Sequence, residues 1–153
     1  MKRRPNPMAT RMHSQGKTDL IKAGIHRLRD AWQLLEAGRL RGAMYLAGYA
    51  VECKLKARLL DQHKVATLAE LERVLQRKIK RRIGLYVHHL NALGSLLVGW
   101  NRLSGFPAFQ RCWSVALSWS VGWRYAREHV LAPEARAFLS SIEECLRWID
   151  RSV

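Results

Sequence analysis

The segment Arg41–Leu60 limits what the chain can fold into, because its pattern predicts a helix that is apolar around most of its circumference. It contains four alanines, which favour the helical backbone, and no proline. A helix of this kind lies in the middle of a protein, with neighbours on more than one side. Its apolar residues fall into two stripes at steps of three and four: Leu40, Met44, Ala47, Val51 and Leu55 in the first, and Leu46, Tyr49, Ala50, Cys53, Ala57 and Leu60 in the second.

Two charged residues and two glycines add detail to this helix. Glu52 and Lys56 are four positions apart, so their side chains meet on one strip of the helix, and the order with glutamate first is the favourable one. Gly42 and Gly48 have no side chain and leave room for a close neighbour. The segment is therefore expected to be tightly packed and to carry one ion pair.

Apolar periodicity predicts further helices on both sides of this segment. The first covers Thr18–Ala37, with Thr18 as its N-cap, and Gly38 ends it so near the next helix that the two should be antiparallel neighbours. Later helices are expected over Thr67–Arg82, over His88–Val98, around Phe109–Trp123 and from Ala132 to the end, with a loop at Gly99–Pro107. The predicted fold class is therefore all-α, a five- to six-helix up-and-down bundle.

The first residues differ from the rest in composition. Residues 1–16 hold several basic side chains and two prolines but no acid. We interpret them as a flexible basic tail and residues 17–153 as the helical bundle domain. The pattern leaves open whether the tail is a plain terminus or an arm that contacts RNA.

The chain carries a formal charge of +15 on 153 residues, and the charge is unevenly placed. No acid occurs between Glu72 and Glu128. This excess favours nucleic acid as the partner, with an anionic membrane surface as the weaker alternative. One helix face carries only positive charges, those of Arg73, Arg77, Lys80 and Arg81. This face is either a solvated surface or an RNA-contacting face.

Other features narrow the class of protein. The cysteines Cys53, Cys112 and Cys145 are far apart and lie on apolar faces, so we expect buried free thiols in a reducing cytoplasm. Neither a metal site nor a cofactor is expected. No apolar run approaches the length of about 20 residues that spans a membrane. The six tryptophans could stack on bases, but Trp32, Trp113 and Trp148 have helical spacing typical of a core.

The pattern of Tyr45, Gly48–Glu52 and Leu55–Ala57 resembles the second helix of the HEPN domain family, which commonly shows a tyrosine, a GYA-x-E run and a lysine–alanine pair. His88-His89-Leu90 partly matches a His-Asp-Leu triplet of that family. The resemblance extends over about Thr18–Val153. It implies a HEPN-type bundle, a homodimer, RNA as the partner, a nucleotidyltransferase-type antitoxin as a second partner, and a toxin–antitoxin, phage-defence or stress setting.

The segment Trp123–His129 contains the one candidate for chemistry. Catalytic HEPN domains carry an arginine, four to six residues and then a histidine, and Arg124 and His129 match that spacing. The family cleaves RNA without a metal. RNA supplies its own nucleophile in the 2′-hydroxyl, a histidine can transfer protons near neutral pH, and an arginine can stabilise the phosphate as charge builds. Arg127 is a candidate RNA contact beside them.

Two interpretations of this segment stay open. Arginine and histidine occur at such a spacing by chance in a basic chain, and Arg124-Tyr125 also resembles a structural Arg-Tyr element that would leave His129 in a loop. The leading hypothesis is an RNA-binding, metal-independent endoribonuclease. The alternative is a non-catalytic HEPN module that dimerises and binds nucleic acid or a nucleotidyltransferase.

Overall fold

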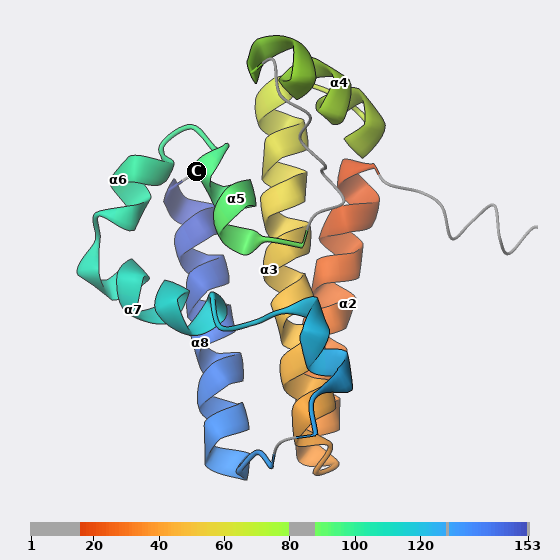
Figure 1. Cartoon of the computed structure of the whole chain (residues 1–153), viewed down its shortest axis with the longest axis vertical. Coiled ribbons are helices and arrows are strands. Elements are labelled where there is room, and N and C mark those ends of the chain that lie inside the picture. The colour runs from red at the N-terminus through yellow and green to blue at the C-terminus, as the bar shows by residue number, and fades with distance from the viewer. Residues whose placement is uncertain (1–15, 80–87, 128, 153) are drawn as a thin grey trace, which may run out of the picture.

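Three long helices form the frame of the protein. The structure is a computed structural model, and it describes residues 16–79, 88–127 and 129–152. Helices α2 (Lys17–Glu36), α3 (Leu40–His63) and α8 (Ala132–Ser152) lie side by side, with α3 packed against both of the others (Figure 1). The described ranges contain no β-strand, which confirms the all-α prediction for that part of the chain. None of the helices described there combines the length and the apolar character needed to cross a membrane.

Short helices connect α3 to α8. They are α4 (Leu68–Ile79), α5 (Leu90–Ser95), α6 (Trp100–Ser104), α7 (Pro107–Ala116) and the 3₁₀-helix η1 (Val121–Tyr125). Helix α4 lies at the far end of α3, α6 and α7 pack on α8, and η1 packs on α3 (Figure 1). The chain direction makes α2 and α3 antiparallel but α3 and α8 parallel, because the return between them is made by short helices instead of one long one. The expected up-and-down order therefore holds for α2 and α3 only.

Helix α3 is central, as its sequence predicts. Ala43, Ala47, Val51, Leu55 and Leu59 have no exposed surface, and they belong to one core with residues from every other long helix. Of the tryptophans expected in the core, Trp113 is buried, and Trp32 and Trp148 are partly buried against the core.

Several predicted boundaries were wrong. The N-cap of α2 is Gly16 and not Thr18, because the Gly16 carbonyl already accepts a hydrogen bond from the Leu20 amide (3.0 Å) and the first turn starts at Lys17. The expected Gly99–Pro107 loop contains α6, since burial of Trp100 and Leu103 stabilises a short helix there. The helix predicted over His88–Val98 is shorter, because α5 has only six residues.

One tryptophan ties the chain after α7 to the middle of α3. The Trp119 ring is buried over Gly48, so closely that a Cβ on Gly48 would lie 2.2 Å from two ring atoms. The indole Nε1 donates a hydrogen bond to the Tyr45 carbonyl (2.9 Å). A helical glycine is needed here because any side chain would occupy the space of the ring. This contact brings η1 alongside α3.

We expect Gly48→Ala to destabilise the protein by about 1–3 kcal/mol, because the added methyl overlaps the Trp119 ring. The matched control is Gly42→Ala in the same helix, where the new Cβ would meet only the Leu34 side chain, at 3.4 Å. Alanine favours a helix over glycine by about 1 kcal/mol, so the control should be neutral or stabilising. Urea unfolding of both variants measures the difference. Equal stability of the two would show that Trp119 is not packed on Gly48 as described.

Candidate functional site

A basic groove lies between the α2–α3 turn and the segment that follows η1. Its volume is about 710 Å³, and the described residues that line it include four arginines and no acid. We call it the arginine groove and define it by Arg39, Arg41, Tyr45, Arg124, Arg127 and His129. All four arginines and His129 are exposed, so a ligand can reach them. Four guanidinium groups around one concavity attract anions, and phosphate above all.

The α2–α3 turn supplies one wall of the groove. Gly38 adopts a left-handed backbone (φ 72°) and ends α2, and the amides of Gly38 and Arg39 donate to the carbonyls of Leu35 (3.0 Å) and Leu34 (2.8 Å). This pattern is a Schellman motif, in which glycine tolerates the positive φ without steric cost. Because α3 begins at once with Leu40, Arg39 and Arg41 are held at the rim.

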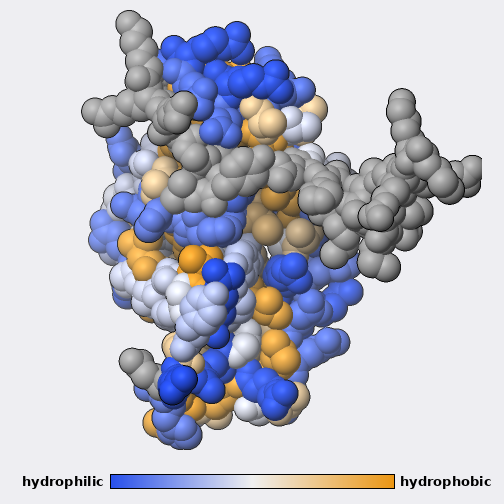
Figure 2. All heavy atoms as spheres, turned by 45° about the vertical axis from the view of Figure 1, so that its right-hand side comes forward, coloured by the Kyte–Doolittle hydropathy of each residue, from blue (hydrophilic) through white to orange (hydrophobic). Residues whose placement is uncertain are grey.

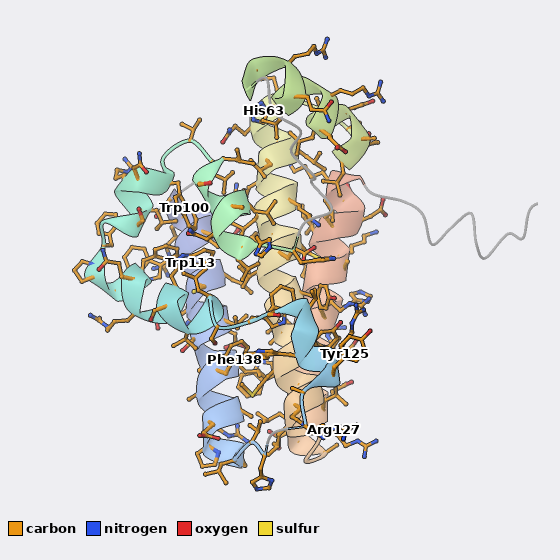
Figure 3. The ribbon with its side chains drawn as sticks, viewed as in Figure 1. His63, Trp100, Trp113, Tyr125, Arg127 and Phe138 are labelled. Atoms are coloured by element: carbon orange, nitrogen blue, oxygen red, sulfur yellow. The ribbon has the colours of Figure 1, made fainter. Side chains whose placement is uncertain are left out.

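The stretch from η1 to α8 supplies the other wall. Ser120 precedes η1, and its hydroxyl accepts a hydrogen bond from the Gly122 amide (2.9 Å). The Arg41 guanidinium donates to the Ala126 carbonyl, which links the two walls. Figure 3 shows Arg127 near the end of the molecule where α2 turns into α3, in keeping with its place on the groove.

The two residues proposed for chemistry line the same groove. Arg124 lies at the end of η1, and its guanidinium sits over the Tyr125 ring, 4.9 Å from the centroid. His129 lies in the link before α8 and also lines an adjoining cavity. The described residues show no hydrogen bond between Arg124 and His129. The structure therefore brings them to one concavity without joining them directly.

The remaining predicted RNA contacts lie elsewhere. Arg73 and Arg77 are exposed on α4, whose end of the molecule is covered by hydrophilic side chains (Figure 2). Their guanidinium Nε atoms donate to backbone carbonyls of the same helix, of Ala69 (3.4 Å) and Arg73 (3.3 Å). Lys80 and Arg81 fall outside the described residues. The predicted set thus divides between α4 at one end of α3 and the arginine groove toward the other.

A polar cluster along α3 consists of the buried residues Glu52 and Lys56 and the exposed His88. Glu52 is 4 % exposed and accepts from Lys56 Nζ (2.6 Å), while its second oxygen lies 2.7 Å from His88 Nδ1. The ion pair between Glu52 and Lys56 follows from their spacing, and its burial was not foreseen. His88 lies two residues before α5 and reaches Glu52, because the chain returns there to the middle of α3.

Tyrosines connect this cluster to the groove. The Tyr49 ring packs edge-on against both His88 and Trp119, and its hydroxyl lies 2.9 Å from that of Tyr45, which lines the groove. Burial and the hydrogen bond with Tyr45 raise the pKa of Tyr49 well above its usual value. The phenol therefore stays neutral even at alkaline pH and serves as a neutral hydrogen-bonding group.

Cysteine chemistry is disfavoured by the surroundings of the thiols. Cys112 and Cys145 are buried and Cys53 is half-buried, and all three are free. Burial raises the pKa of Cys53 to about 11 and also raises that of the other two. A protonated thiol is a poor nucleophile at neutral pH. In the described part of the chain, no group of His, Cys, Asp and Glu could hold a metal ion.

Sequence reasoning missed the contribution of the α2–α3 turn to the site. Arg39 and Arg41 have no motif around them, and only the fold shows that the start of α8 comes back to this turn. The sequence places Tyr45 in a helix pattern and does not indicate that it lines the groove.

Comparisons of the chain with protein-family models, curated proteins and solved structures find no match. The site must therefore be interpreted from its own geometry.

The buried ion pair generates a stability prediction. Glu52→Ala should lower the free energy of unfolding by about 3–5 kcal/mol, because Lys56 would remain buried without its partner. Replacing both residues together, as Glu52→Leu with Lys56→Met, should cost less than the single change, since no uncompensated charge is left. Thermal and urea unfolding measure both variants.

The control is an exposed pair of the same chemistry. Glu36 binds Arg136 at 3.1 Å on the surface, and Glu36→Ala should change stability by about 1 kcal/mol at most. If Glu52→Ala were no more harmful than Glu36→Ala, Glu52 and Lys56 would have to be solvated.

Proposed function

We propose that the chain is an RNA-binding protein of the HEPN type that cleaves RNA in the arginine groove without a metal ion. The observation that carries the proposal is that Arg124 and His129, matched to the family motif by spacing alone, line one concavity with three further arginines. The groove has the charge expected of a phosphate-binding surface and is open to solvent.

The chemistry assigned to the groove uses groups that are present. The RNA 2′-hydroxyl attacks the adjacent phosphorus, the new O2′–P bond forms, and the P–O5′ bond breaks. The His129 imidazole takes the 2′-hydroxyl proton or protonates the leaving O5′, and water completes the other transfer. The Arg124 guanidinium stabilises the charge that gathers on the phosphate oxygens. Arg39, Arg41 and Arg127 hold the neighbouring phosphates.

The HEPN resemblance adds expectations about assembly. It implies a homodimer in which two such motifs face each other, so that the second copy supplies a further Arg124 and His129. It also implies a nucleotidyltransferase-type antitoxin as a partner and a toxin–antitoxin, phage-defence or stress setting. These belong to the same proposal, and size-exclusion chromatography with light scattering tests the dimer.

A second candidate is RNA binding without cleavage. The position of Arg124 over the Tyr125 ring favours it, because the cation–π contact gives this arginine a structural role that does not require catalysis. In that case the groove would hold RNA, and His129 would be one of its polar contacts.

The deciding experiment is cleavage of single-stranded RNA in excess EDTA. We expect products with 2′,3′-cyclic or 3′-phosphate ends and no cleavage of the matching DNA, which lacks the nucleophile. His129→Ala should slow cleavage by about 10²–10⁴-fold through the loss of proton transfer. Arg124→Ala should have an effect of similar size through lost charge stabilisation. Denaturing gels and end analysis measure both.

The matched control is Arg127→Ala, which removes a groove arginine with a smaller expected effect, that of one phosphate contact. Circular dichroism and light scattering must first show that each variant keeps its fold and assembly. Binding without cleavage by the wild type, or equal cleavage by His129→Ala, would replace the nuclease with the non-catalytic RNA-binding module.

A further inference from the structure

A second cavity adjoins the arginine groove and differs from it in chemistry. Its volume is about 400 Å³, and five residues line both cavities, Arg41, Trp123, Ala126, His129 and Val130. The two are therefore neighbouring parts of one surface. Both volumes lie within the range of about 300–1,000 Å³ that is usual for small-ligand sites.

We propose that this second cavity is a nucleobase subsite that selects bases with an exocyclic amino group (cytosine, adenine or guanine) over uracil. The inference rests on the proposed function, because it places the phosphate of the same nucleotide in the arginine groove. We call this cavity the base pocket.

The residues found in only one of the two cavities separate most of the arginines from the one acid. Arg39, Arg124 and Arg127 line only the arginine groove. The base pocket instead adds Met44, Ser118 and Glu134 to the shared residues. A ligand that fits both parts has an anionic end and a flat, largely apolar end that donates hydrogen bonds. A nucleotide has that character.

The apolar wall of the base pocket is held in place. Trp123 is half-buried, and its ring packs against that of Phe138 with 5.4 Å between centroids. Met44 and Val130 are partly buried against the core on the same pocket. An aromatic ring held by a neighbouring ring offers a stacking surface, and stacking tolerates any base because every base has a π-face.

Glu134 supplies the discrimination that stacking lacks. It is the one acid among the described residues that line either cavity. Its Oε2 accepts a hydrogen bond from the Leu131 amide (2.9 Å), which orients the carboxylate in the first turn of α8. Within the described residues, its Oε1 has no hydrogen-bond partner. An ionised carboxylate only accepts, so it favours an amino group and disfavours the O4 carbonyl of uracil.

Isothermal titration of the full chain with 5′-CMP and 5′-UMP tests the proposal. The two nucleotides have the same phosphate and similar size and differ at the amino group and ring nitrogen. We expect CMP to bind about tenfold more tightly, the effect of one hydrogen bond to a charged acceptor. In Glu134→Gln the side chain can both donate and accept, so the CMP/UMP ratio should fall toward one. Its amide oxygen can still accept from Leu131, so the fold should be retained.

Two controls separate discrimination from charge. Inorganic phosphate reports the groove alone, and its binding should be equal or tighter in Glu134→Gln because a negative charge is lost nearby. Glu144→Gln removes one acid from the same helix away from both cavities, and it should leave the ratio unchanged. Equal binding of CMP and UMP by the wild type, failure of both to bind, or a ratio unaffected by Glu134→Gln overturns the base pocket.

An RNA arm distinguishes this proposal from the proposed function. The pentamers UUCUU and UUUUU carry equal charge, and the first should bind more tightly if the base pocket serves RNA. A CMP preference that depends on Glu134, together with no RNA binding, would retain the pocket as a site for free nucleotides and reject the RNA-binding function. RNA binding without any preference between the pentamers would retain the RNA-binding function and reject the base pocket.

Discussion

The contact between Trp119 and Gly48 is the constraint on which the candidate site depends. The indole fills space that only a glycine leaves open on α3, and its Nε1 binds the Tyr45 carbonyl one turn away. That contact sets where the chain enters η1, and η1 in turn determines where Arg124 lies. The Arg41 guanidinium holds the following stretch at Ala126. These two contacts hold the link before α8 in place as a wall opposite the α2–α3 turn.

Much of the frame could be predicted from the sequence because it depends on local periodicity. The central position of α3 follows from its two apolar stripes, and the antiparallel pairing with α2 follows from the short turn at Gly38. The pairing of Glu52 with Lys56 follows from their spacing. Their burial, and the link from Glu52 to His88, do not, because they depend on how a segment 36 residues later returns to α3.

The two cavities show the same limit. A local motif predicts Arg124, Arg127 and His129, whereas Arg39, Arg41 and Glu134 lie in separate parts of the chain that only tertiary packing brings together. The buried ion pair on α3 and the arginines of the groove have different consequences. The Glu52–Lys56 pair is buried and bears on stability, while the arginines are exposed and balanced by no acid among the described groove residues. Tyr45 and Tyr49 lie where the two meet.

The most direct test of the account is whether RNA binds at the arginine groove or on α4. The double variants Arg39→Gln with Arg127→Gln and Arg73→Gln with Arg77→Gln remove equal charge from the two surfaces. Fluorescence anisotropy with a short RNA over a range of salt measures the slope of log affinity against log salt, which falls by about 0.7 for each lost phosphate contact. We expect weaker binding and a shallower slope for the groove variant, with little change for the α4 variant. The reverse result would contradict it.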